Sequence, residues 1–146
     1  MSSRPYRITA SQEAARIDIE GVDQGLGDFN EQYGGLDAVR PLYLMAHDEA
    51  GQLAGGIIAR TWGECCEVQM LWVEETRRGE GLGRTLMTRA EDAARERGCT
   101  LLYLDTFTFQ APELYRGLGY DEDLVIRGFP GGVAKHHFSK RLVDAE

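Results

Sequence analysis

Long apolar runs are missing from this sequence: none approaches the roughly 20 residues that a helix needs to cross a bilayer. The first five residues also lack the apolar core of a secretion signal. Basic residues are few, with 16 Lys and Arg against 24 Asp and Glu, and the net charge of −8 does not suit a nucleic-acid partner. We therefore expect a cytoplasmic protein that binds neither a membrane nor nucleic acid.

Metal-binding patterns are also missing. The three cysteines, Cys65, Cys66 and Cys99, are an odd number without metal-ligand spacing. Neighbouring residues of a strand point to opposite faces, so His136 and His137 cannot grip one metal ion. We interpret the cysteines as packing residues in a reducing compartment and expect no metal.

The pattern of apolar residues predicts one α+β domain over residues 1–146, without repeats or linkers. It contains an antiparallel meander, one right-handed parallel strand–helix–strand crossover and two final strands. The expected strands are 6–9, 42–47, 52–62, 65–73, 101–104, 123–127 and 135–142. The expected helices are 22–33, 82–97 and 112–116, while residues 13–20 fit a helix or a strand. Gly55 and Gly56 indicate a bulge or a close backbone approach inside a strand.

Three alternate glycines, Gly79, Gly81 and Gly83, follow the third meander strand and open an amphipathic helix. The free N–H groups and the dipole of a first helical turn favour an anion, and glycine allows close approach. A P-loop is excluded because Arg84-Thr85 replaces Lys-Ser/Thr after the last glycine. A dinucleotide-binding fold is excluded because three antiparallel strands come first and too little chain follows.

Two segments resemble the signatures of the GNAT superfamily of acyl-CoA-dependent N-acetyltransferases. Arg78-x-x-Gly81-x-Gly83 is similar to the Arg/Gln-x-x-Gly-x-Gly/Ala signature, and residues 114–120 are similar to Leu-Tyr-x-x-x-Gly-Phe/Tyr. Both occur in the expected order, and the resemblance runs from about residue 6 to residue 142. It implies a GNAT-like fold, in which the meander and the central crossover form a splayed, mixed sheet of six to seven strands flanked by about four helices.

The resemblance implies acetyl-CoA as co-substrate. Backbone amides of the glycine turn would hold its pyrophosphate, and the pantetheine arm would lie where strand 70–73 splays from strand 101–105. The family commonly has Asn seven residues before the tyrosine of the second signature; here that position is Thr108, and Thr108 or Gln110 could substitute. The implied coenzyme-binding residues are Leu71, Trp72, Val73, Arg78, Gly79, Glu80, Gly81, Leu82, Gly83, Arg84, Thr108, Gln110 and Tyr115.

Acetyl transfer to an amine needs a base, a donor for the developing oxyanion and an acid for the departing thiolate. For the base, the resemblance points to Glu67, whose offset from Val73 matches a strand glutamate of the histone-acetylating branch. Strand alternation would place Glu67 on the same face as Leu71 and Val73. Alternatively, the Glu67 carboxylate faces solvent or pairs with an arginine. The amine would then lose its proton through a chain of water molecules.

For the other two groups, the resemblance implies the backbone N–H of Leu71 at the oxyanion and Tyr115 near the coenzyme sulfur. A tyrosine hydroxyl with an ordinary pKa of ~10 can protonate a thiolate. The alternative for Tyr115 is simple packing of its short helix against the sheet.

We therefore expect an acetyl-CoA-dependent N-acetyltransferase that modifies the primary amine of a small molecule by direct attack in a ternary complex. A protein N-terminus or lysine is the alternative acceptor, and a non-catalytic acyl-CoA sensor is the alternative from another class. Dimers are common in the family. No segment of this chain identifies the acceptor or a dimer interface.

Overall fold

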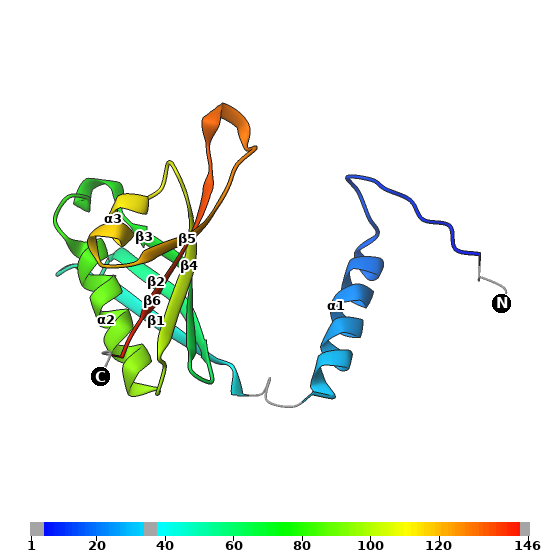
Figure 1. Cartoon of the computed structure of the whole chain (residues 1–146), viewed down its shortest axis with the longest axis horizontal. Coiled ribbons are helices and arrows are strands. Elements are labelled where there is room, and N and C mark those ends of the chain that lie inside the picture. Colours follow the sequence, from blue (N-terminus) through cyan, green and yellow to red (C-terminus); the bar gives the residue numbers. More distant parts are fainter. Residues whose placement is uncertain (1–4, 34–37, 144–146) are drawn as a thin grey trace. The chain divides into compact units, whose positions relative to one another are not determined.

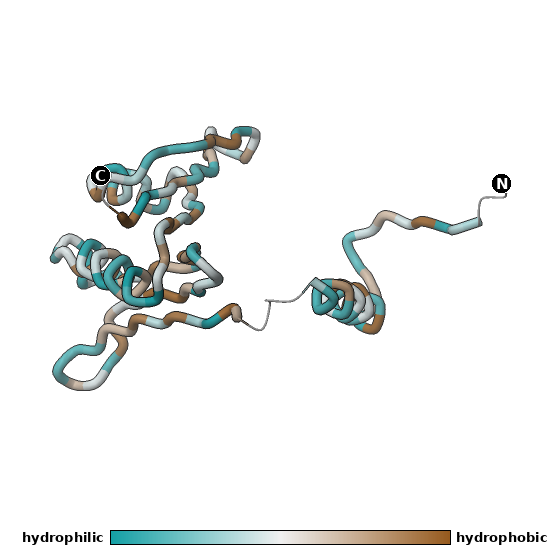
Figure 2. The backbone as a smooth tube through the Cα atoms, turned by 60° about the horizontal axis from the view of Figure 1, so that its bottom comes forward, coloured by the Kyte–Doolittle hydropathy of each residue, from teal (hydrophilic) through white to brown (hydrophobic). Residues whose placement is uncertain are grey.

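The computed structural model describes residues 5–33 and 38–143, and the chain falls into two compact units, residues 1–36 and 37–146 (Figure 1). The first unit contains α1 (Arg16–Glu31), so residues 16–20 of the ambiguous stretch are helical, whereas residues 13–15 lie in neither a helix nor a strand. Apolar and polar residues both occur along α1 (Figure 2). The strand expected at 6–9 was wrong, because residues 5–15 pair with no strand among the described residues.

The second unit is a six-stranded sheet in the order β1-β2-β3-β4-β6-β5. Only β3 and β4 are parallel, which confirms the meander and the single crossover. The strands are β1 (Arg40–His47), β2 (Leu53–Trp62), β3 (Cys65–Val73), β4 (Leu101–Phe107), β5 (Asp121–Ile126) and β6 (Lys135–Arg141). With α2 (Leu82–Glu96) and α3 (Pro112–Gly117), the described residues hold three α-helices instead of about four.

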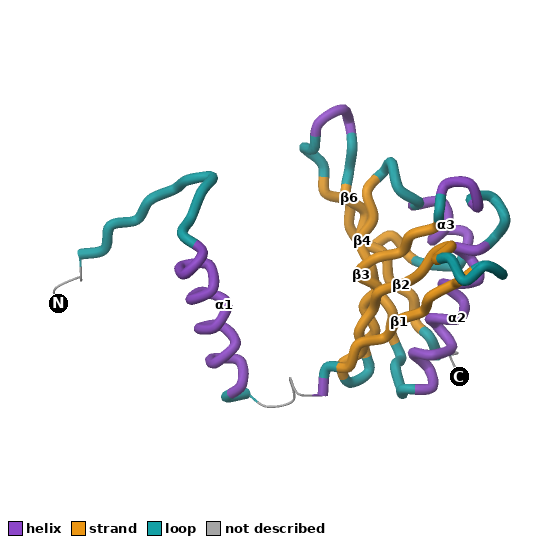
Figure 3. Tube along the Cα trace, turned by 180° about the vertical axis from the view of Figure 1, so that it is seen from behind, coloured by secondary structure: helices purple, strands orange, loops and turns teal. Residues whose placement is uncertain are grey.

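Both helices of the second unit lie on one face of the sheet (Figures 1 and 3). The core on that face is apolar, and Ile57, Leu102 and Phe138 are fully buried in it. From α2, Met87 packs into the same core. None of the helices in the described residues combines the length and the apolarity that a bilayer crossing requires.

β3 and β4 pair over a short stretch only, from Cys65 with Leu101 to Val68 with Leu104. Beyond it, β3 continues beside β2 and β4 continues beside β6, so the two parallel strands part. A bulge lies at the same point of β3, because Ala59 faces Val68 while the preceding residue of β2 faces Met70. The expected splay is therefore present, and it coincides with an extra residue in β3.

The bulge changes which residues of β3 face the core. Cys66 and Val68 are buried before the bulge, whereas Leu71 and Val73 pack against the core after it. The alternation has shifted by one residue, so Glu67 lies on the opposite face from Leu71 and Val73. The prediction that these three residues share a face was wrong, because it assumed an uninterrupted period of two.

Gly55 lies where β2 supports the end of β3. A Cβ atom at this position would stand 2.8 Å from the carbonyl oxygen of Trp72 and 3.3 Å from Cδ2 of Leu82. The backbone of β3 and the start of α2 therefore need a glycine here. The expected close backbone approach is confirmed.

Replacing Gly55 with alanine should lower the free energy of unfolding by about 1–3 kcal/mol, because the added methyl group forces β2 and β3 apart. Urea unfolding measures this change. The control is Gly25→Ala in α1, where an added Cβ meets nothing within 4 Å and alanine is the better helix former. Equal effects of both substitutions would contradict the close approach.

Candidate active site

A cavity of about 770 Å³ opens where β3 and β4 part. Its size is in the range of small-molecule and cofactor sites. Its walls come from the end of β3, the turn into α2, the end of β4 with the loop after it, and α3. The lining residues are Gln69, Met70, Leu71, Trp72, Val73, Arg77, Arg78, Gly79, Gly81, Leu82, Gly83, Arg84, Asp105, Thr106, Phe109, Gln110, Ala111, Leu114 and Tyr115.

The turn before α2 presents backbone donors to this cavity. Gly81 caps the helix with φ of 85°, a left-handed conformation that glycine adopts without strain, and it supplies no side-chain cap. The first backbone N–H that bonds inside the helix is that of Thr85, which donates to the oxygen of Gly81 at 3.0 Å. The three N–H groups before it, at residues 82–84, have no helical acceptor. Together with the helix dipole they form an anion site.

Arginines line the same end of the cavity. Nε of Arg78 donates to the carbonyl oxygen of Val73 at 3.1 Å, which ties the turn to the end of β3. Arg77 pairs with Asp48 at 2.7 Å between Nη2 and Oδ2. Arg78 and Arg84, which also lines the cavity from α2, add positive charge around the free amides. The glycine turn therefore suits a ligand that carries phosphate groups.

Tyr115 lines the cavity from α3 and is 5% exposed. The ring centroids of Tyr120 and Phe138 lie 6.0 and 5.8 Å from its own. Burial raises the pKa of Tyr115 to about 12, so its hydroxyl keeps the proton at neutral pH. A buried hydroxyl that keeps its proton can act as a hydrogen-bond donor to a group bound in the cavity.

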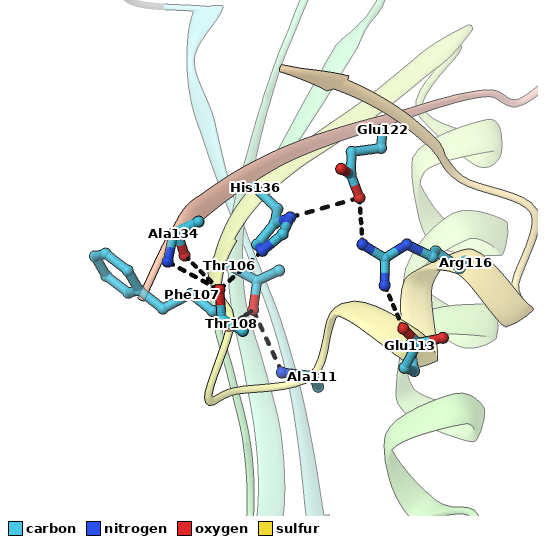
Figure 4. A network of polar contacts seen from close by, with 9 residues as sticks. All are labelled: Thr106, Phe107, Thr108, Ala111, Glu113, Arg116, Glu122, Ala134 and His136. Atoms are coloured by element: carbon cyan, nitrogen blue, oxygen red, sulfur yellow. Dashed lines mark hydrogen bonds and ion pairs between the residues drawn. The ribbon is translucent and has the colours of Figure 1, made fainter. Parts of the chain in front are cut away.

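Most of the predicted coenzyme-binding residues lie around the cavity. Those that line it are Leu71, Trp72, Val73, Arg78, Gly79, Gly81, Leu82, Gly83, Arg84, Gln110 and Tyr115. Glu80 and Thr108 are not among the lining residues. The Thr108 hydroxyl donates to the carbonyl oxygen of Ala134 at 3.1 Å and accepts from the backbone N–H of Ala134 at 2.9 Å (Figure 4). It also lies 3.0 Å from Nε2 of His136. These contacts hold the loop that follows β4. The coenzyme-binding roles of the predicted residues stay predictions.

Glu67 does not line the cavity either. Its Oε1 accepts a hydrogen bond from Nε of Arg60 at 2.8 Å, and Nη2 of the same arginine lies 2.8 Å from it in an ion pair. Pairing with an arginine was one of the alternatives open for this residue. Its role as the base stays a prediction.

Asp105 is the carboxylate among the lining residues that the structure describes, and it was not predicted from the sequence. Asp105 follows the apolar run of β4, and its Oδ1 lies 2.9 Å from Nδ1 of His137. His136 instead is buried and contacts Thr108 and Glu122, so the two histidines face opposite ways as expected. Within residues 5–33 and 38–143, no cluster of His, Cys, Asp or Glu is arranged to hold a metal ion. The signal for Asp105 in the sequence was an acidic residue directly after the apolar run of β4.

An ionic network fixes α3, the helix that carries Tyr115. Arg116 pairs with Glu113 on the same helix and with Glu122 on β5, and Oε2 of Glu122 lies 3.5 Å from Nδ1 of His136 (Figure 4). The hydrogen bond from Arg116, followed by its charge and the contact with His136, holds the pKa of Glu122 below its ordinary 4.5. The ionised form of Glu122 is therefore the form that the fold favours.

Stability that depends on ionised Glu122 is present above pH 4.5 and is lost as the pH falls through the lowered pKa of the folded state. We expect Glu122→Gln to make the free energy of unfolding fall less steeply between about pH 5 and pH 3. Urea unfolding at a series of pH values measures this slope. Glu113→Gln is the control, because its carboxylate contacts the same arginine but is 85% exposed. Identical slopes for wild type and Glu122→Gln would refute the linkage.

Comparison with known proteins places this geometry in context. A model described as the Acetyltransferase (GNAT) family matches residues 10–120. Blasticidin-S acetyltransferase of Streptomyces morookaense is 39% identical over 107 residues, which cover 70% of this chain and 79% of that protein. IAA acetyltransferase of Azospirillum brasilense is 41% identical over 124 residues, which cover 78% of this chain and 81% of that protein. The crystal structure of an acetyltransferase from Bacillus cereus ATCC 14579 superposes with a TM-score of 0.77 at 31% identity, over 91% of this chain and 97% of that one.

Proposed function

The chain belongs to the acetyltransferase (GNAT) family, and from this premise we propose that it transfers the acetyl group of acetyl-CoA to the primary amine of a small molecule. We further propose direct attack by the amine in a ternary complex. The family uses acetyl-CoA as its donor. The observation that carries the proposal is the cavity, which joins a helix N-terminus at one end to a parted pair of strands at the other.

In this proposal the pyrophosphate of the coenzyme lies on the free amides of residues 82–84, beside Arg78 and Arg84. The pantetheine arm lies between β3 and β4, against the edge of β3 that pairs with no described residue of β4 beyond Val68. A strand edge of this kind offers main-chain donors and acceptors to an extended ligand. The thioester then lies near Leu71 and Tyr115, which both line the cavity.

The reaction needs few protein groups. The amine nitrogen attacks the thioester carbon, the N–H of Leu71 donates to the developing oxyanion, and the carbon–sulfur bond breaks. Tyr115 then donates its proton to the departing thiolate. Burial raises the pKa of Tyr115 to about 12, so the hydroxyl still carries its proton when the thiolate departs.

The relatives support a small acceptor. Two of them are named for the compounds that they acetylate, blasticidin S and IAA, and not for proteins. The net charge of −8 is compatible with a cationic amine. Neither observation favours a protein N-terminus or lysine as acceptor.

The first test is an amine panel with acetyl-CoA, in which a thiol reagent records free coenzyme A and mass spectrometry identifies the acetylated product. We expect thiol release that depends on the amine. Tight binding of acetyl-CoA, measured by calorimetry, without release for any amine would overturn the proposal in favour of a sensor.

A second test concerns Tyr115. Tyr115→Phe should lower kcat by about 100-fold, because the thiolate loses its proton donor, while the affinity for coenzyme A changes by no more than about twofold. Steady-state kinetics and calorimetry give the two values.

The matched control is Tyr120→Phe. Tyr120 is a neighbouring buried tyrosine whose hydroxyl donates to Oε2 of Glu91 at 2.7 Å, outside the set of lining residues. The Tyr120→Phe variant should keep the wild-type kcat, while its free energy of unfolding falls by about 1–3 kcal/mol. Equal losses of kcat and coenzyme affinity in Tyr115→Phe would contradict the role of Tyr115 as the acid.

A further inference from the structure

We propose that Asp105, rather than Glu67, accepts the proton of the acceptor amine, and that His137 is the positioning residue that holds Asp105 for this step. The inference rests on the proposed function, because it assigns a group to the same reaction. It arises from the position of Asp105, its free oxygen and its cross-strand neighbour.

Asp105 stands where β3 and β4 part. The last pair of the two strands is Val68 with Leu104, so Asp105 is the first residue of β4 beyond their hydrogen bonds. It lines the cavity together with Gln69, the extra residue of β3 on the other side of the gap. The coenzyme arm that enters this gap ends at its apex, so Asp105 lies where the thioester and the amine would meet.

The cavity is electrically polarised. Arg77, Arg78 and Arg84 line the end at the glycine turn, where the phosphates of the donor would bind. Asp105 is the carboxylate among the described lining residues, and it belongs to β4 rather than to that turn. An amine acceptor arrives as an ammonium ion, whose strongest hydrogen-bond partner is a carboxylate. The donor and the acceptor therefore meet charges of opposite sign in the same cavity.

His137 orients the carboxylate. The two residues face each other directly across β4 and β6, and Nδ1 of His137 lies 2.9 Å from Oδ1 of Asp105. A carboxylate only accepts hydrogen bonds, so Nδ1 carries the hydrogen. The ring of His137 is held by the ring of Tyr103, with centroids 5.9 Å apart, and Nε2 lies 4.0 Å from Oδ2 of Asp123.

The second oxygen of Asp105 is the one available to the acceptor. Across the part of the chain that the structure describes, hydrogen bonds and ion pairs of Asp105 involve Oδ1 alone. Glu67 differs from Asp105 in position, because it lies outside the lining of the cavity, and its own partner is Arg60.

The ammonium ion gives one proton to Oδ2 of Asp105, and the side chain, 43% exposed, releases it to solvent. The neutral amine forms the carbon–nitrogen bond as the carbon–sulfur bond breaks. The nitrogen then loses a second proton, which restores Tyr115 after its hydroxyl has protonated the thiolate. An ammonium ion and an acetyl thioester thus become an amide, a thiol and one released proton.

The test uses an amine that the wild-type enzyme acetylates. Asp105→Asn should lower kcat by about 100-fold or more, with the affinity for coenzyme A within about twofold of wild type. Glu67→Gln is the matched control and should stay within about threefold of wild-type kcat. Added formate should restore part of the activity of Asp105→Ala, because a free carboxylate can enter the vacated space. A merely structural role of Asp105 predicts no such rescue.

His137 is tested by two substitutions. The amide of His137→Asn can still donate to Oδ1 of Asp105, so this variant should keep most of kcat. His137→Leu cannot donate and should lose about tenfold or more in kcat with little change in coenzyme affinity. Equal activity of the two variants would overturn the positioning role.

The outcomes separate the two levels of the proposal. Suppose that the wild type acetylates an amine, that Asp105→Asn is as active as wild type and that Glu67→Gln is inactive. The assignment of Asp105 is then overturned, and the proposed function stands. If the wild type acetylates no amine, the proposed function is overturned and the assignment falls with it.

Discussion

The hydrogen bonds between β3 and β4 end at Val68 and Leu104, and the rest of the candidate site depends on where they end. A parallel pair that stops part-way leaves two strand edges without partners, and buried main-chain groups need partners. A ligand with an extended, polar arm can supply them. The gap is kept open because each strand continues beside a second neighbour: β3 pairs with β2, and β4 pairs with β6.

The same gap organises the charges. The turn that follows β3 ends in the free amides of α2, and its arginines collect at that end of the cavity. The strand on the other side contributes Asp105 at the apex. α3 brings in Tyr115, and the pairing of Arg116 with Glu122 fixes this helix to β5. One interruption of hydrogen bonding thus places an anion site, a carboxylate and a protonated phenol around a single space.

Much of this could be predicted from local patterns. The glycine turn, the meander and the crossover depend on residues that are near one another in the chain, and they were confirmed. The errors have one cause. The strand expected at 6–9 had the right alternation but no partner, and the shared face of Glu67 and Leu71 assumed a regular β3. Strand pairing and bulges depend on what lies opposite, which a local pattern does not contain.

By itself, the sequence determined the anion-binding turn, because Gly81 and the first turn of α2 form from adjacent residues whose backbone geometry is local. It also determined the second signature and its tyrosine. Only the tertiary structure decided which carboxylate reaches the cavity. Glu67 and Asp105 both lie on strands, but Glu67 stands within the paired stretch of β3 and β4 and contacts Arg60, while Asp105 stands just beyond that stretch, opposite His137, and lines the cavity. That choice depends on contacts between residues far apart in the chain.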